Sequence, residues 1–183
     1  MEWVFDGGRP CLDLVNTLRD RYQPEGVELL TSPEALAEWL SLAGLTKGPV
    51  PVTQEDLETA KWLREAVNRL VTTPPAPPDV ELVNKAVEEP LPNARLRLSD
   101  GELRKAAPTP RNPVAAAFAL IATDVIELVT SPVDVRVCAA DDCGLRFADA
   151  SPRRTRQWCS MSRCGNRAKA RAHYARLSQG RSR

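Results

Sequence analysis

The segment that decides the fold of the C-terminal part is CAADDCGLRFADASPRRTRQWCSMSRC, residues 138–164. It contains four cysteines in the pattern Cys138-x4-Cys143-x15-Cys159-x4-Cys164. Each close pair can bind one ion locally, while the residues between the pairs fold back to bring all four thiols together. The spacing therefore predicts a tetrahedral site with four thiolate ligands.

Zinc suits such a site best, because it is redox-inert and accepts four thiolates in tetrahedral geometry. A full set of protein ligands leaves no open position for water, so the predicted site is structural and not catalytic. The spacing alone leaves three alternatives open: four unrelated buried cysteines, two disulfides, or an iron–sulfur cluster. The N-terminus lacks the pattern of a secretory signal, which disfavours disulfides.

The residues around the cysteines predict a strand, a turn and a helix. Alternating valines over 133–137 indicate a short strand that leads into the first cysteine. Gly144 permits a tight turn, and the apolar residues of 145–147 indicate a returning strand. Ser160 or Ser162 can cap a helix that runs to about Leu177, which places the last cysteine in the first helical turn.

The remainder of the chain is predicted to be mostly helical. Capping residues, apolar periodicity and prolines predict helices over about 11–22, 33–43, 54–72, 79–88 and 113–130, and an alternating pattern around Asp100-Gly101 predicts a hairpin over 93–105. Ser131-Pro132 ends the last of these helices and is the predicted domain boundary. The predicted fold class is α+β and mainly helical: residues 1–131 form a helix-rich domain with a small antiparallel sheet, and residues 132–183 form a four-cysteine unit.

Charge is distributed unevenly along the chain. Residues 1–150 carry 15 Lys and Arg against 24 Asp and Glu, whereas residues 151–183 carry ten basic residues and no acidic one. A basic segment of this kind repels itself unless an anionic surface neutralises it. We expect DNA to be that surface. Two alternatives stay open: the segment docks on an acidic protein surface, of this chain or of a partner, or it is simply solvated.

The basic residues recur at helical spacing. Arg163, Arg167 and Arg171 are four residues apart and share one face of the predicted helix. Guanidinium groups match phosphate oxygens and can also read guanine in the major groove. The predicted nucleic-acid contacts are Arg153, Arg154, Arg156, Arg163, Asn166, Arg167, Lys169, Arg171 and Arg176.

Two short motifs resemble known families. The run WCSMSRCGNR over 158–167, with the preceding cysteine pair and FADAS over 147–151, resembles the CGNR zinc-finger family. CLDLVNT over 11–17 is similar to the start of the ABATE domain. The resemblance implies a bacterial stress-induced transcription regulator, with a mainly helical N-terminal domain and a C-terminal zinc finger that binds DNA. It also implies that Cys138, Cys143, Cys159 and Cys164 are the zinc ligands.

Several other residues carry weaker expectations. Asp13 and Asn16 either line a pocket for a small-molecule effector or satisfy buried backbone groups. Cys11, Trp39 and Trp62 lie on apolar helix stripes and are predicted to be core residues.

The sequence also predicts the class of protein. No nucleophile–base pair or phosphate loop is recognisable, so we expect no enzymatic activity. The chain has no apolar run long enough to span a membrane, and we expect a cytoplasmic protein without a membrane partner. In this interpretation the finger contacts DNA, and the N-terminal domain forms a homodimer or senses an effector.

Overall fold

The structure is a computed structural model that describes residues 3–91, 95–106 and 109–180, and the side chains of these residues except 172 and 175–180. The chain divides into two compact units. The helical unit comprises Thr31–Thr130, and the cysteine unit comprises Met1–Leu30 together with Ser131–Arg183. The helical unit ends beside Ser131-Pro132, whereas the first 30 residues group with the C-terminal ones and not, as in the predicted 1–131 domain, with the helices. The predicted fold class, α+β and mainly helical, is confirmed.

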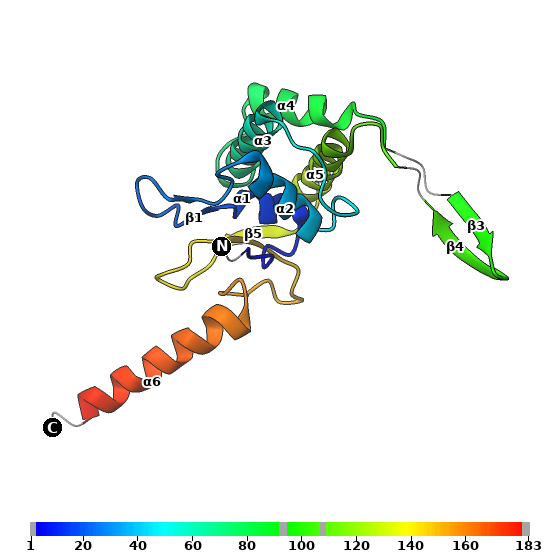
Figure 1. Ribbon diagram of the computed structural model, residues 1–183. Helices are drawn as coiled ribbons and strands as arrows, with labels where there is room; N and C mark the ends of the chain where they lie inside the picture. Colours follow the sequence, from blue (N-terminus) through cyan, green and yellow to red (C-terminus); the bar gives the residue numbers. More distant parts are fainter. Residues whose placement is uncertain (1–2, 92–94, 107–108, 181–183) are drawn as a thin grey trace. The chain divides into compact units, whose positions relative to one another are not determined.

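The helical unit is built around three helices that pack on one another, α3, α4 and α5 (Figure 1). α5 supplies more of the buried apolar side chains than any other helix of the unit, including Phe118, Ile121 and Val125. The elements of the unit are α2 (Pro33–Leu42), α3 (Gln54–Thr72), α4 (Pro77–Val87), β3 (Arg95–Ser99), β4 (Glu102–Ala106) and α5 (Pro113–Val129).

Three of the helices begin at the capping residues that the sequence predicts. The side chain of Ser32 accepts from the backbone of α2, and the side chain of Asn112 accepts from that of α5. Thr53 and Asp56 form a reciprocal capping box at the start of α3. These bonds satisfy backbone N–H groups that have no partner inside the helix, so helix starts are encoded locally.

The predicted hairpin is present as the antiparallel pair β3–β4, with Leu98 opposite Leu103. Its turn residues Asp100 and Gly101 have φ angles of 53° and 79°. Two consecutive residues with positive φ are typical of a type I′ turn, whose twist matches that of the two strands that it joins. Residues 93 and 94 of the predicted range lie outside the described part of the chain.

One core prediction in the helical unit is wrong. Trp39 is buried as expected, but Trp62 is 61% exposed. The buried side of α3 carries Leu57, Ala60 and Leu63. Trp62 lies one position before Leu63, which rotates it about 100° away from that stripe.

The cysteine unit combines the N-terminal segment with the four-cysteine region. α1 is shorter than the helix predicted over 11–22: it ends at Val15, and Leu18–Arg19 instead pairs with Val27–Glu28. Cys11 is buried on α1, as predicted. The elements are α1 (Pro10–Val15), β1 (Leu18–Arg19), β2 (Val27–Glu28), β5 (Asp134–Val137), β6 (Arg146–Asp149), the π-helical turn η1 (Met161–Gly165) and α6 (Asn166–Gly180).

Among the described residues, no helix is both long enough and apolar enough to cross a membrane. The longest of the described helices, α3, carries its buried apolar residues on one face, and its charged residues lie mostly outside that face. This pattern is that of a helix with one face on a protein core.

Candidate metal centre

The four cysteines predicted as ligands meet at one point of the cysteine unit. Their Sγ atoms all lie within 4.8 Å of one another, and all four residues are buried. No other group of three or more candidate ligand side chains gathers in this way among the described residues. The alternative of four unrelated core cysteines is therefore excluded.

The first pair of cysteines is held by a turn between β5 and β6. The N–H of Cys138 donates to the carbonyl of Leu145 at 2.8 Å, and the N–H of Cys143 donates to the carbonyl of Ala140 at 3.1 Å. Gly144 follows with a φ of 71°, in the left-handed region that glycine adopts without a Cβ clash. The turn thus points both thiols to the same side.

The second pair is positioned by a backbone contact and a helix start. The N–H of Ala139 donates to the carbonyl of Gln157 at 2.9 Å, which brings the second pair beside the first. Ser160 caps η1, and the N–H of Cys164 donates to the Ser160 carbonyl at 3.0 Å. Cys164 therefore lies in the first helical turn, where backbone N–H groups favour a thiolate.

The spacing of the sulfur atoms fits a tetrahedral zinc site. Sγ of Cys159 lies 3.7 Å from Sγ of Cys143 and 3.7 Å from Sγ of Cys164. Four thiolates at the usual Zn–S distance require sulfur atoms about 3.8 Å apart. None of the five cysteines, all of which the structure describes, forms a disulfide, and these separations are far longer than a disulfide bond. Two disulfides are therefore excluded.

The thiols do not ionise equally without a metal ion. A hydrogen bond from Cys159 lowers the pKa of Cys143 to about 5. The hydrogen bond that Cys159 donates to Cys143, and then burial, raise the pKa of Cys159. Burial raises the pKa of Cys164 to about 11. Four thiolates therefore need a cation, and a divalent ion supplies the positive charge that they lack.

The ligands are also half of the core around them. The buried cluster contains eight residues, four of which are the cysteines, with Trp158 packed against it. Val4 comes from the N-terminal segment, and Phe147 from β6. Only four residues of this cluster besides the ligands are available for apolar packing, so the metal is expected to contribute to the stability of the finger.

Hydrogen bonds connect the N-terminal segment to β6, the strand that follows the first cysteine pair. The amide of Asn16 accepts from the N–H of Arg146 and donates to the carbonyl of Arg146, both at 2.9 Å. The N–H of Ala148 donates to the carbonyl of Gly7 at 2.9 Å. Asp13, the other residue proposed for an effector pocket, accepts from the N–H of Gly7 at 2.8 Å. Both side chains thus bond to backbone groups, and an effector site there stays a prediction.

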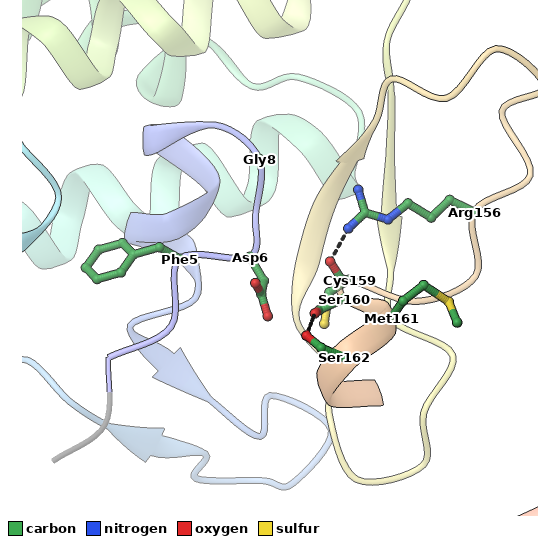
Figure 2. A pocket seen from close by; sticks show the side chains of 8 residues that line it. All are labelled: Phe5, Asp6, Gly8, Arg156, Cys159, Ser160, Met161 and Ser162. Atoms are coloured by element: carbon green, nitrogen blue, oxygen red, sulfur yellow. Dashed lines mark hydrogen bonds between the residues drawn. The ribbon is translucent and has the colours of Figure 1, made fainter. Parts of the chain in front are cut away.

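Arg156 has a role inside the unit that the sequence did not reveal. Its guanidinium donates to the carbonyls of Trp158 and Cys159 and lies 4.8 Å from the centre of the Phe147 ring. Figure 2 shows this side chain beside Cys159, at an open cleft of about 500 Å³. The cleft is polar: Asp6 faces it from the N-terminal segment.

Asp149 organises the loop that precedes Arg156. It is buried and accepts from the N–H and hydroxyl of Ser151 and from the N–H of Arg156. It also pairs with Arg136 at 3.3 Å. The hydrogen bond from the Ser151 hydroxyl is the main cause that lowers the pKa of Asp149. The Asp-x-Ser spacing, typical of a local side-chain turn, is the signal that could have identified this residue.

The residues after Cys164 pack against the ligands. A Cβ on Gly165 would lie 2.5 Å from the sulfur of Met161, so only glycine leaves room for that side chain as it lies. Nη2 of Arg167 lies 2.9 Å from the carboxylate of Asp142 and 3.7 Å from Sγ of Cys164. The guanidinium of Arg167 thus contacts both the thiol of Cys164 and Asp142, which lies in the turn between the first two cysteines.

Three of the predicted nucleic-acid contacts are engaged in ion pairs. Arg163 lies 3.4 Å from Asp6. Arg167 and Arg171 both contact Asp142, at 2.9 and 2.6 Å, and the hydrogen bond from Arg171 lowers the pKa of that carboxyl. All three arginines remain partly exposed. Arg167 and Arg171 hold α6 on the turn between the first two cysteines, whereas Arg163 of η1 pairs with the N-terminal segment.

The other predicted contacts lie at the surface. The side chains of Arg153, Arg154, Asn166 and Lys169 are exposed. Arg153 and Arg154 belong to the loop before the second cysteine pair, and Asn166 and Lys169 belong to α6. Arg176 lies on α6, but its side chain is outside the described part of the chain.

The contacts of Arg167 lead to a test of its role at the centre. We expect Arg167→Gln to weaken zinc affinity about tenfold, because partners of a ligand usually contribute a factor of ten or more. Lys169→Gln removes the same charge from an exposed position of the same helix and should leave zinc affinity unchanged. Equilibrium competition with a colorimetric chelator measures both variants. Equal affinities would contradict the assigned role.

Two family models match the chain. The first, ABATE, is described as "Putative stress-induced transcription regulator" and matches residues 8–132; the second is the CGNR zinc finger and matches residues 135–177. Nothing among the curated proteins matches. The four cysteines lie within the second range and form a zinc site, which also excludes the iron–sulfur alternative. The chain is a member of the ABATE family that carries a C-terminal CGNR zinc finger.

Proposed function

We propose that this protein regulates transcription by binding DNA through a basic surface on its zinc finger. The surface comprises Arg153 and Arg154 on one loop and Lys169 on α6, and we call it the basic surface from here on. The observation that carries the proposal is the exposure of these cations on a segment with ten basic residues and no acidic one. Such a surface attracts phosphate groups at long range.

The fold explains how the basic surface would be held in place. Zinc, when bound, would join the four cysteines and so connect the start of α6 to the turn between β5 and β6. Arg167 and Arg171 bind Asp142 and fix the helix on the turn between the first two cysteines. The loop that carries Arg153 and Arg154 is held by two hydrogen bonds of Arg156: its N–H donates to the carboxylate of Asp149, and its guanidinium donates to the carbonyl of Cys159. Cations fixed in this way lose less conformational freedom on binding than cations on a flexible tail.

Binding to duplex DNA tests the proposal. We expect full-length, zinc-loaded protein to raise the fluorescence anisotropy of a labelled random duplex, with an affinity that falls steeply as salt increases. Arg153→Gln/Arg154→Gln should weaken binding about tenfold and make the log–log salt slope shallower by about two. The full chain is required because residues of the N-terminal segment are part of the finger's core.

A charge-matched control separates local contacts from net charge. Lys61→Gln/Arg111→Gln removes two cations from the helical unit and should leave DNA affinity within about twofold of the unmodified protein. Undiminished binding by Arg153→Gln/Arg154→Gln would exclude the basic surface as the contact. No binding at low salt by the unmodified protein would overturn the DNA proposal and favour an acidic protein partner.

Two further expectations belong to this proposal. The role is non-enzymatic, because four thiolates fill the coordination of zinc and leave no position for a substrate or water. The location is cytoplasmic, because five cysteines without a disulfide among them suit a reducing compartment. A small-molecule effector of the N-terminal domain remains a hypothesis for which ligand screening by thermal shift is the direct test.

A further inference from the structure

The β3–β4 hairpin presents an apolar face to solvent. Residues that lie opposite each other in an antiparallel pair share a face. Leu98 lies opposite Leu103, and Leu96 lies opposite Lys105, so the three leucines are on one side of the hairpin. Their exposed fractions are 77% for Leu96, 69% for Leu98 and 72% for Leu103. Exposed apolar clusters of this kind mark surfaces that bind another molecule.

The opposite face of the hairpin is basic. Arg97 lies opposite Arg104, and Arg95 lies opposite Ala106. The hairpin has four basic residues against the two acidic residues Asp100 and Glu102. A lone two-stranded hairpin is marginally stable in water, and both of its edges can accept further contacts. Its partner should therefore be apolar in the middle and acidic around it.

A groove with that character lies among α3, α4 and α5 of the helical unit. It has a volume of about 720 Å³, and Leu63, Leu82 and Phe118 contribute its apolar lining. The exposed Trp62, which the sequence misplaced in the core, lines it as well. The charged residues of the groove are four carboxylates and one amine: Glu55, Glu58, Glu88, Glu89 and Lys85.

The two surfaces complement each other in polarity and in charge. We propose that the β3–β4 hairpin of one copy docks in this groove on a second copy, and that the second copy returns the same contact. The leucine face covers Trp62 and the apolar lining, and Lys105, which lies on the same face of the hairpin, is set against the carboxylates of the groove. Two identical contacts related by a two-fold axis close the assembly as a dimer.

A second copy of the chain would cover both the leucine face of the hairpin and the acidic groove, whereas DNA would contact only the basic face of the hairpin. The basic face of the hairpin would suit phosphate groups, but the leucines would then stay in water. The groove would stay empty, because its carboxylates repel a phosphate backbone. Reciprocal docking removes the leucines and Trp62 from water together and places a hairpin with an excess of basic residues beside a groove with an excess of carboxylates.

Sedimentation velocity of the full-length, zinc-loaded protein without DNA tests the proposal. We expect a dimer at micromolar concentration. Leu98→Ser/Leu103→Ser should raise the dissociation constant about a hundredfold or more, because each dimer loses four buried leucines. Leu42→Ser, a leucine that is 57% exposed on α2 and outside both surfaces, is the matched control and should leave the dimer intact. Circular dichroism should show the same helix content in all these proteins.

A groove variant and a mixing experiment identify what the hairpin binds. Trp62→Ala/Glu88→Lys should also be monomeric. A mixture of the hairpin variant and the groove variant retains one intact contact and should form a heterodimer at concentrations where each variant alone is a monomer. A monomeric unmodified protein, a dimeric hairpin variant, a dimeric groove variant or a mixture that stays monomeric would each overturn reciprocal docking.

Discussion

Replacing Cys164 with alanine is expected to abolish stoichiometric zinc binding and to unfold the cysteine unit. Structural zinc typically contributes about 10–16 kcal/mol to the folding of a small domain. Cys164 is fully buried, and its Sγ lies 3.7 Å from that of Cys159. Four of the eight residues in the buried cluster are ligands, so little apolar core remains without the metal. This is the largest effect that we expect from any single substitution.

Metal analysis of the purified variants measures this effect, and Cys11→Ala is the matched control. Cys11 is equally buried and belongs to the same unit, but it lies on α1 and outside the quartet. We expect one zinc ion per chain for the unmodified protein and for Cys11→Ala, and none for Cys164→Ala. One zinc ion per chain in Cys164→Ala, or loss of zinc from Cys11→Ala, would show that the ligand assignment is wrong.

Hydrogen exchange on the same variant tests how far the unfolding extends. Val4 packs in the metal cluster, and Gly7 bonds to Ala148, so backbone amides of residues 4–18 should lose protection together with those of β5 and β6. Amides of α3 and α5 should keep their protection, because these helices have their own core in the helical unit. Protection of α1 in the zinc-free variant would contradict the grouping of the N-terminal segment with the finger.

The zinc site could be predicted from sequence because its determinants are local. A pair of cysteines separated by four residues, with Gly144 beside it, specifies a turn that needs no distant partner. The same holds for helix starts at Ser32 and Thr53, where a side chain caps a backbone group three residues away. Interactions between residues a few positions apart can therefore be predicted from the sequence alone.

The roles of Asn16 and Arg156 could not be predicted, because their partners are defined only by the folded chain. Asn16 bonds to the backbone of a residue 130 positions away. Arg156 sits among nine basic neighbours in the C-terminal segment, and composition alone assigned it to DNA, whereas its guanidinium donates to two carbonyls beside the zinc site. Periodicity likewise placed Trp62 in the core, because a long helix with several apolar positions does not reveal the edge of its buried stripe.

Replacing Asn16 with alanine is expected to destabilise the zinc-bound finger from a distance of 130 residues in sequence. The substitution removes two hydrogen bonds of 2.9 Å, one to the N–H and one to the carbonyl of Arg146. Asn16 is buried, so water does not readily replace its amide at this position. Two such losses should lower the free energy of unfolding of the cysteine unit by about 3 kcal/mol.

The same change should weaken zinc binding, because metal binding and folding of this unit are coupled. If the metal-free unit is unfolded, destabilising the folded form by about 3 kcal/mol lowers the apparent zinc affinity about a hundredfold. Chelator competition measures the affinity, with Asn84→Ala, an exposed position on α4, as the control that should retain full affinity. Equal zinc affinities for Asn16→Ala and Asn84→Ala would mean that the finger folds independently of the N-terminal segment. A selective loss in Asn16→Ala would instead establish that the ABATE match and the finger match share one folding unit, since Asn16 lies in the first and Arg146 in the second.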